Sequence, residues 1–232
     1  SDLNIVKNLE NVREFANTTN FDSNNRTRAY MKVQDGCNRF CTYCIIPFAR
    51  GPIRSRTIED SVREARTLAD RSFKEIVLTG IHIGSFGKDL GDMRLIDLIE
   101  AIAEVDGIER IRLSSVEPLI ITDEFMERAV KTGKLCDHFH LSLQSGSNNI
   151  LKAMNRRYTR EEYIEKAKII RKYMPHAGLT TDIIVGFPGE SDEDFEDSMN
   201  IVREVGFSRI HVFKYSKRKN TKAAEMKKIG RA

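Results

Sequence analysis

The sequence is poor in cysteine and has no long apolar stretch. Only 4 of its 232 residues are cysteines, too few and too clustered for the disulfide framework of a small secreted protein. Neither a signal peptide nor an apolar run long enough to cross a membrane is present. We therefore expect a protein of the reducing cytoplasm that has no membrane partner.

A strong charge of either sign is also absent. The 38 Lys and Arg residues give a net charge of +4 against 34 Asp and Glu residues, which allows a polyanionic partner but falls short of a dedicated nucleic-acid module. A chain of this length can bury a full core. We interpret residues 29–216 as one domain, preceded by a lead-in segment at 1–28 and followed by a basic linker at 217–232. Because the chain starts at Ser1 and is charged at both ends, we expect a central piece of a longer protein.

Three of the four cysteines lie in one short segment. Cys37, Cys41 and Cys44 have the spacing C-x3-C-x2-C. Iron–sulfur clusters are held by Cys thiolates, normally one per iron in a four-iron cube, so three thiolates would leave one iron open to another molecule. Structural zinc is the alternative, but it needs four ligands, usually in two separated pairs. Since no second pair exists, a zinc site would have to recruit Cys136 or a distant histidine, and the pattern favours the cluster.

The order of helices and strands predicts an α/β fold. Thr57 is expected to cap a helix, with Asp60 three residues further on. The predicted strands span 29–34, 75–80, 110–114, 138–143, 179–185 and 209–215. The other predicted helices span 95–105, 123–132, 160–173 and 192–205. Strands that alternate with helices favour right-handed βαβ units and a parallel sheet.

One face of these strands is polar. Alternate residues place on it Tyr30, Lys32, Gln34, Arg112, Ser114, His138, His140, Ser142, Gln144, Thr180, Asp182, His211 and Tyr215. Strands covered by helices on both sides would be apolar on both faces, so we expect a curved, incomplete barrel with an open polar interior. Functional loops of such barrels lie at the carboxyl ends of the strands, and the cysteine segment follows the first strand.

Two charged segments are open to a functional or a structural interpretation. Arg50, Arg54 and Arg56 directly follow the cysteine segment and could bind phosphate or carboxylate groups of a substrate, or be solvated surface residues. The acidic run at 190–197 begins a predicted helix, where carboxylates suit the helix dipole, and we expect it to be a solvated face. The turn at 186–189 (GFPG) ends a strand and could also contact a ligand.

Several motifs follow one another along the chain. They are 36–44 (GCNRFCTYC), 50–56 (RGPIRSR), 78–82 (LTGIH), 143–146 (LQSG), 154–156 (MNR) and 182–190 (DIIVGFPGE). In this order they resemble the radical S-adenosylmethionine (SAM) enzymes, specifically the tRNA methylthiotransferases. The resemblance covers about residues 29–232 and implies the partial (β/α)6 barrel of the radical SAM type.

The resemblance also implies cofactors. Cys37, Cys41 and Cys44 would ligate one 4Fe–4S cluster, whose free iron would chelate the amino and carboxylate groups of SAM. One electron from a reductant or an electron-donor protein would then cleave SAM to a deoxyadenosyl radical. The residues implied in SAM binding are Tyr43, Thr79, Gly80, Ser142, Gln144 and Asp182. The resemblance assigns no catalytic side chain.

Two segments narrow the expected substrate. The sequences at 79–82 (TGIH) and 114–118 (SSVEP) resemble the branch that methylthiolates N6-threonylcarbamoyladenosine beside the tRNA anticodon, which makes tRNA the expected partner. Full-length members also have an N-terminal domain with a second cluster and a C-terminal RNA-binding β-barrel, which we expect to lie outside this stretch, the latter beyond the linker. The alternatives are methylthiolation of a ribosomal protein and a zinc-stabilised RNA-binding module without catalysis.

Overall fold

The computed structural model describes residues 12–16, 27–91 and 93–227. Its strands are β1 (Arg28–Asp35), β2 (Arg54–Ser55), β3 (Glu75–Gly80), β4 (Arg110–Leu113), β5 (His138–His140), β6 (Gly178–Val185) and β7 (Arg209–Lys214). Its α-helices are α1 (Ile46–Arg50), α2 (Ile58–Asp70), α3 (Leu95–Ala103), α4 (Asp123–Lys131), α5 (Asn148–Ala153), α6 (Arg160–Tyr173) and α7 (Asp192–Val205). Single 3-10 turns are η1 (Ile83–Ser85), η2 (Pro118–Ile120) and η3 (Lys222–Ala224).

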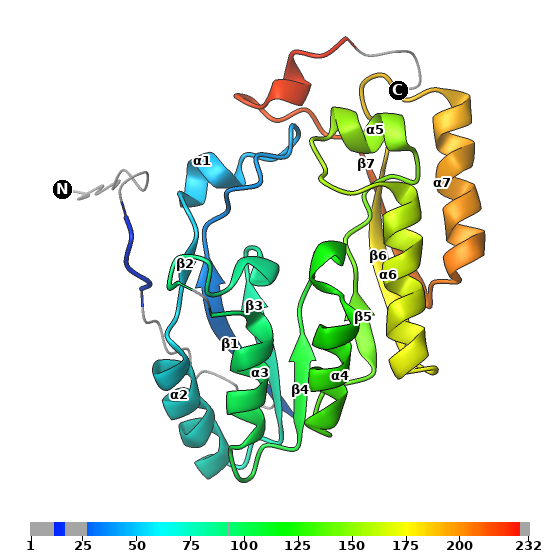
Figure 1. The fold of residues 1–232 in the computed structure, drawn as a ribbon. Helices are drawn as coiled ribbons and strands as arrows, with labels where there is room; N and C mark the ends of the chain where they lie inside the picture. Colours follow the sequence, from blue (N-terminus) through cyan, green and yellow to red (C-terminus); the bar gives the residue numbers. More distant parts are fainter. Residues whose placement is uncertain (1–11, 17–26, 92, 228–232) are drawn as a thin grey trace, which may run out of the picture.

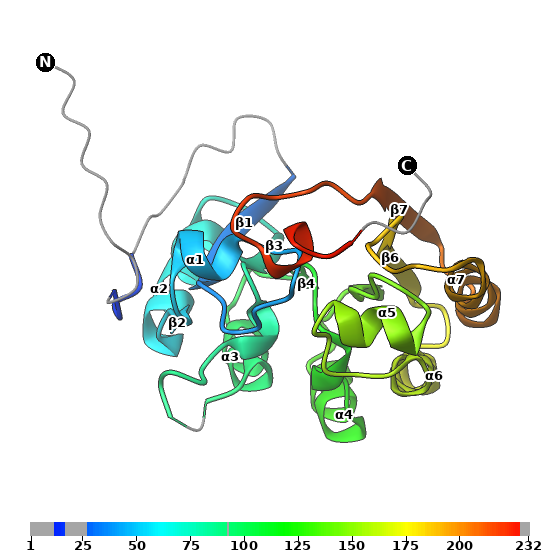
Figure 2. The same ribbon diagram turned by 90° about the horizontal axis from the view of Figure 1, so that it is seen from above.

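The strands form a curved row with the longer helices along its outer side (Figure 1). One sheet has the order β2-β1-β3-β4 and the other β5-β6-β7, and all pairs are parallel except β1 with the short β2. Isolated parallel bridges, Ile111 to Leu135 and Val116 to Leu141, join the two sheets. The row ends in β2 on one side and in β7 on the other, and no strand pairing of the described residues joins these two ends, so the barrel is open (Figure 2). The predicted partial barrel of parallel strands is confirmed.

The core lies between the strands and the outer helices. In β1, Ala29, Met31 and Val33 are buried, whereas Tyr30 on the opposite face is 45% exposed. The alternation follows from the two-residue period of a strand, which directs successive side chains to opposite faces. The apolar set packs with the buried side of the helices, and its removal from water is the main stabilising term of the fold. The polar alternation read from the sequence therefore marks the open interior face.

Most predicted element boundaries agree with the structure to within two residues. Thr57 caps α2 as predicted, because its hydroxyl accepts a hydrogen bond from the Asp60 backbone N–H at 3.2 Å. The strand predicted at 138–143 is the exception, since regular pairing ends at His140. Beyond it only isolated bridges remain, and Gln144 adopts a left-handed φ of 75°, a conformation that ends a regular strand.

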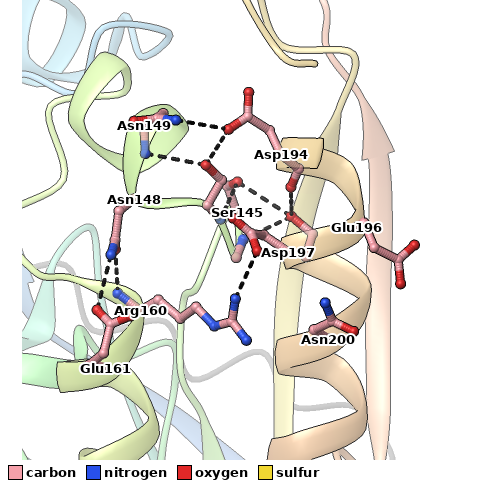
Figure 3. Close-up of polar contacts among 12 residues, drawn as sticks. Ser145, Asn148, Asn149, Arg160, Glu161, Asp194, Glu196, Asp197 and Asn200 are labelled. Carbon is pink, nitrogen blue, oxygen red and sulfur yellow. Dashed lines mark hydrogen bonds and ion pairs between the residues drawn. The ribbon is translucent and has the colours of Figure 1, made fainter. Parts of the chain in front are cut away.

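The acidic run at 190–197 is more than the solvated face that we expected. Asp194 is buried and forms a capping box with Ser191 at the start of α7. It also accepts a 2.5 Å hydrogen bond from the Ser147 hydroxyl, while Asp197 pairs with Arg160 of α6 at 3.0 Å (Figure 3). The Ser147 contact fastens the loop after β5 to α7, and the Asp197 contact joins α6 to α7.

The described part of the expected linker, residues 217–227, is packed against the domain. This segment passes over the carboxyl ends of the strands (Figure 1), and Ala223 within η3 is 1% exposed. The lead-in at 1–28 falls mostly outside the described residues. Among the helices of the described ranges, none combines the length and apolar content that crossing a membrane requires.

Candidate cluster and cofactor site

The cysteine loop begins with a backbone turn that only glycine can make. Gly36 follows β1 with a φ of +71°, and a Cβ atom at this position would lie 1.8 Å from the Pro52 carbonyl oxygen. This close approach lets the Cys37 backbone N–H donate to the Gly51 carbonyl at 3.0 Å. The loop that carries the three thiols is therefore pressed against the segment that follows α1.

A buried glutamine ties the start of this loop to the neighbouring strand. The Gln34 side-chain amide donates to the carbonyls of Asp35 and Gly36, at 2.6 and 2.7 Å. Its oxygen accepts from the backbone N–H of His82, just after β3, at 2.7 Å. Gln34 is fully buried, so all these bonds form away from water, where an unsatisfied amide would be costly. The carboxyl ends of β1 and β3 are thereby held in one arrangement.

The other side of the cysteine loop docks on the end of α5. The Thr42 backbone N–H donates to the Met154 carbonyl at 3.1 Å, and the Thr42 hydroxyl to the Ala153 carbonyl at 2.8 Å. Asn155, with a φ of 59°, donates from its amide to the carbonyls of Arg39 and Phe40 at 3.2 and 3.0 Å. Sequence reasoning quoted the segment 154–156 as a motif but gave it no role. The structure shows that it supports the loop from 115 positions away.

The loop presents its thiols beside a partly buried cation. Burial raises the pKa of the Cys37 and Cys44 thiols, and repulsion from the Cys41 sulfur raises both further. The Arg156 guanidinium donates to the Cys41 sulfur at 3.5 Å. Burial alone would lower the pKa of Arg156, but Tyr158, a neighbouring tyrosine and Cys41 raise it, so the guanidinium stays charged. Burial and mutual repulsion therefore disfavour the thiolate form of Cys37 and Cys44. A bound metal would offset both effects, because its positive charge stabilises thiolates.

The donor set fits an iron–sulfur cluster better than a single zinc ion. A tetrahedral zinc ion with bonds near 2.3 Å brings its sulfur ligands to within about 4 Å of one another. Among the described residues, the three ligand atoms gathered within 4.8 Å of one another belong to His140, Asp182 and His211, not to the cysteines. Cys136 precedes β5, at the opposite end of the barrel from the loop that follows β1. A zinc site completed by Cys136 is therefore not formed.

A cavity of about 290 Å³ lies next to this loop. Tyr43, Gln144 and Asp182, all predicted to bind the cofactor, lie in its wall together with residues of β7 and the segment after it. Tyr43 packs edge-on against Phe187 with ring centroids 6.5 Å apart. The positive φ of Gln144 is unusual for a residue with a side chain and is the kind of strain found at ligand sites. The structure thus brings three of the predicted residues together.

The other predicted cofactor residues lie nearby but do not form the wall of this cavity. Thr79 and Gly80 end β3, and the Thr79 hydroxyl donates to the Met31 carbonyl at 3.2 Å. A Cβ atom at Gly80 would lie 2.9 Å from the side-chain oxygen of Gln34, so this glycine admits the buried amide. The Ser142 carbonyl accepts from Arg156 at 3.0 Å. These residues surround the cysteine loop, and their contact with SAM stays a prediction.

The prediction that the arginines after the loop bind substrate needs a correction for Arg54 and Arg56. Arg54 is 4% exposed and pairs with Asp35 at 3.5 Å, and Arg56 is 6% exposed and pairs with Glu64. Both guanidinium groups are therefore committed to internal carboxylates, which argues against the substrate contacts suggested by the sequence. Arg50 is the exposed member of the three and keeps that prediction.

A buried network that sequence reasoning missed holds Arg39 within the cysteine loop. Glu117, whose side chain is 3% exposed, pairs with Arg39 and lies 3.3 Å from His82 Nε2. The Ser85 hydroxyl lies 2.6 Å from His82 Nδ1. Burial raises the pKa of Glu117, but the hydrogen bond and charge of His82 and the nearby arginines lower it below its usual value. The segments 79–82 and 114–118, from which the substrate branch was inferred, therefore meet at the cluster loop.

These features define a class of domain: an open α/β barrel with a loop of three thiols beside a cavity. A family model described as the radical SAM superfamily matches residues 31–202. The chain belongs to this superfamily, whose cofactors are a 4Fe–4S cluster and SAM. The predicted fold, family and cofactors are confirmed. A solved structure of the radical SAM methyltransferase TsrM from Kitasatospora setae has the same fold, with a TM-score of 0.70 and 16% identity over 84% of this chain and 36% of that one.

Two curated relatives are more similar in sequence. The threonylcarbamoyladenosine tRNA methylthiotransferase MtaB of Bacillus subtilis is 44% identical over 97% of this chain and 50% of its own length. The tRNA-2-methylthio-N(6)-dimethylallyladenosine synthase of Pelotomaculum thermopropionicum is 47% identical over 86% of this chain and 45% of its own. The predicted resemblance to tRNA methylthiotransferases is confirmed. The chain spans about half the length of these relatives.

Proposed function

We propose that this chain is the SAM-cleaving domain of a tRNA methylthiotransferase. The observation that carries the proposal is the docked loop of Cys37, Cys41 and Cys44 beside the cavity lined by Tyr43 and Gln144. The three thiolates would hold the cluster, and the cavity would take SAM. When bound, the cluster and SAM supply a one-electron reductive cleavage of the cofactor. The electron would come from a reductant or an electron-donor protein.

The chain's own residues would position these cofactors. Gln34 and Asn155 fix the two sides of the cysteine loop, which would keep the three thiolates in place to hold the cluster. Tyr43 offers an aromatic face in the cavity wall for the adenine ring, and Gln144 and Asp182 offer polar atoms for the rest of SAM. Such preorganisation reduces the entropy lost when cofactor and substrate are brought together.

The proposed substrate is N6-threonylcarbamoyladenosine of tRNA. The 44% identity to MtaB over 97% of the chain supports it, as do the segments 79–82 and 114–118, which meet at the Arg39–Glu117 network. Dimethylallyladenosine is the second candidate, because synthases of that name are 42–47% identical. All these relatives are named as tRNA-modifying enzymes, which favours tRNA over a ribosomal protein. A tRNA substrate would also place the protein in the cytoplasm.

We assign SAM cleavage to this domain and the supply of sulfur to the rest of a full-length enzyme. Insertion of sulfur requires a sulfur source, which we assign to a second cluster outside this stretch. The domain alone should release methionine and deoxyadenosine from SAM, but should not form methylthiolated nucleoside.

The test begins with anaerobic reconstitution of the chain with iron and sulfide. Dithionite and SAM are then added, and deoxyadenosine is measured by chromatography. We expect product with wild type and with Cys136→Ala, whose thiol lies at the other end of the barrel, and none with Cys41→Ala. Absence of deoxyadenosine from a sample with a complete cluster would refute SAM cleavage. Mass spectrometry of nucleosides from tRNA treated with the full-length enzyme then decides between the two adenosine substrates.

A further inference from the structure

Three potential metal ligands meet on the strands farthest from the cysteine loop's own strand. His140 is in β5, Asp182 in β6 and His211 in β7. The parallel register pairs His140 with Thr180 and Asp182 with His211, so all these side chains share one face of the sheet. The arrangement follows from the strand pairing itself, because residues two apart on β6 face the same way.

The ligand atoms converge. His140 Nε2 lies 3.2 Å from one Asp182 oxygen and His211 Nδ1 lies 3.2 Å from the other. The two imidazole rings are stacked, with centroids 5.8 Å apart and planes 25° from parallel. One ligand atom from each of the three residues lies within 4.8 Å of the others. We propose that His140, Asp182 and His211 form a binding site for a divalent transition-metal ion, distinct from the cysteine loop.

A further residue orients the site. The Thr180 hydroxyl lies 2.9 Å from His140 Nδ1 and 3.3 Å from His138 Nε2. With the ring proton of His140 on Nδ1, Thr180 accepts it, and Nε2 is free to bind a metal. Metal-bound histidines usually donate their other ring N–H to such a partner, which fixes the ring and its tautomer.

The donor set indicates the class of ion. Two imidazole nitrogens and one carboxylate oxygen suit zinc and other late first-row metals, whereas magnesium and calcium prefer oxygen ligands throughout. Three protein ligands leave a coordination position open. The side chains of His140, Asp182 and His211 are 13%, 25% and 47% exposed, so an ion can reach them. Because Asp182 also lies in the cavity wall, the bound ion would adjoin the proposed SAM pocket.

The test uses the chain with its cluster already reconstituted, so that the three cysteines are occupied. The protein is dialysed anaerobically against Zn²⁺, and zinc, iron and sulfide per chain are measured by elemental analysis. We expect one zinc per chain beyond the cluster, and its loss in His140→Ala and in His211→Ala. His176→Ala, at an exposed histidine outside the strands, is the matched control and should retain zinc. Thr180→Val should weaken zinc binding about 10- to 100-fold.

The outcomes separate this site from the cluster and from the proposed function. Wild type that takes up no zinc beyond the cluster would overturn the proposal. So would zinc binding that survives both histidine substitutions, since the ion would then lie elsewhere. Circular dichroism and cluster content establish that each variant is folded. Because the His211 side chain is 47% exposed, we expect His211→Ala to fold. Its zinc content can therefore be measured even if His140→Ala fails to fold. None of these measurements depends on SAM cleavage or on tRNA.

Discussion

The two sheets of the domain differ in how far their charged residues are exposed to solvent. In the sheet β2-β1-β3-β4, which carries the cysteine loop, cations and carboxylates are buried in pairs. Arg54 pairs with Asp35, and Arg56 with Glu64, and all four residues are less than 9% exposed. A buried pair costs desolvation of both charges, and removing one partner leaves the other uncompensated. We therefore expect substitution of any of these four residues to be costly.

The sheet β5-β6-β7 is open by contrast. Its edge strand β7 is largely exposed, with Val212 at 62% and Phe213 at 53%. The polar residues of its interior face, such as Asp182 and His211, contact one another and remain reachable from outside. The difference indicates that these charged groups of the first half are committed to internal pairs, whereas those of the second half remain reachable by small molecules.

The largest effect should come from Gly36→Ala in the first half. The added Cβ would lie 1.8 Å from the Pro52 carbonyl oxygen, and the left-handed φ of +71° disfavours any residue with a side chain. The backbone of the loop would therefore have to move. We expect the chain to retain little or no cluster after reconstitution, measured as iron and sulfide per chain. Gly189→Ala, also at a positive φ but with open space around its Cβ, is the control. Equal cluster loss in both variants would contradict the steric argument.

The next effect should come from Glu117→Ala. This change leaves Arg39 and His82 without their buried carboxylate, and breaking such a pair costs about 3–5 kcal/mol. We expect thermal or chemical unfolding to show a loss of this order. Glu124→Ala removes an exposed partner of Arg94 and should leave stability unchanged within error. A small effect at Glu117 would show that the first half is less dependent on its buried pairs than we infer.

A smaller effect should distinguish electrostatics from packing. Arg156→Met keeps much of the side-chain volume but removes the cation that donates to the Cys41 sulfur. Hydrogen bonds and charge near the sulfurs tune the potential of a cluster. Loss of the cation should lower the reduction potential, on the order of 60 mV for a tenfold change in the one-electron equilibrium. Spectroscopic titration measures it, and Arg160→Met, which removes the partner of Asp197 instead, should not shift the potential.

The smallest effect should come from the edge of the second sheet. Val212 is the most exposed of the large apolar residues in β7, and a surface change away from special features usually alters stability by less than about 0.5 kcal/mol. Val212→Thr should therefore be nearly neutral in denaturant unfolding. A loss as large as that at Glu117 would erase the contrast between the two sheets.

The sequence predicted the architecture because periodicity and strand–helix alternation are local signals. The Thr57 cap and the helix at 160–173 are set by neighbouring residues, and both agree with the structure. The three-thiol loop was equally readable, because its ligands lie within eight positions. The short α1 and α5 were missed, since few residues define them.

Ion pairs and hydrogen bonds between residues far apart in the sequence could not be predicted. Arg54 and Arg56 resembled surface phosphate ligands because Asp35 and Glu64, which bury them, are recognisable only in the fold. Asn155 and Arg156 support the cysteine loop from more than 110 positions away. Pattern alone could list such residues as motifs, but the physical reason for them is a tertiary contact.

The docking of the cysteine loop has a consequence for how the protein is made. The three thiols lie at 37–44, yet their supports are the residues at 153–156 and Ala223, whose backbone N–H donates to the Thr42 carbonyl at 2.9 Å. A ribosome makes the chain from the amino end, and domains fold as their later parts emerge. The thiols are thus synthesised long before their enclosure is complete. The last of these supports, Ala223, is synthesised about 180 residues after the last of the three thiols, so the enclosure of the loop is completed only when nearly all of the domain has been made.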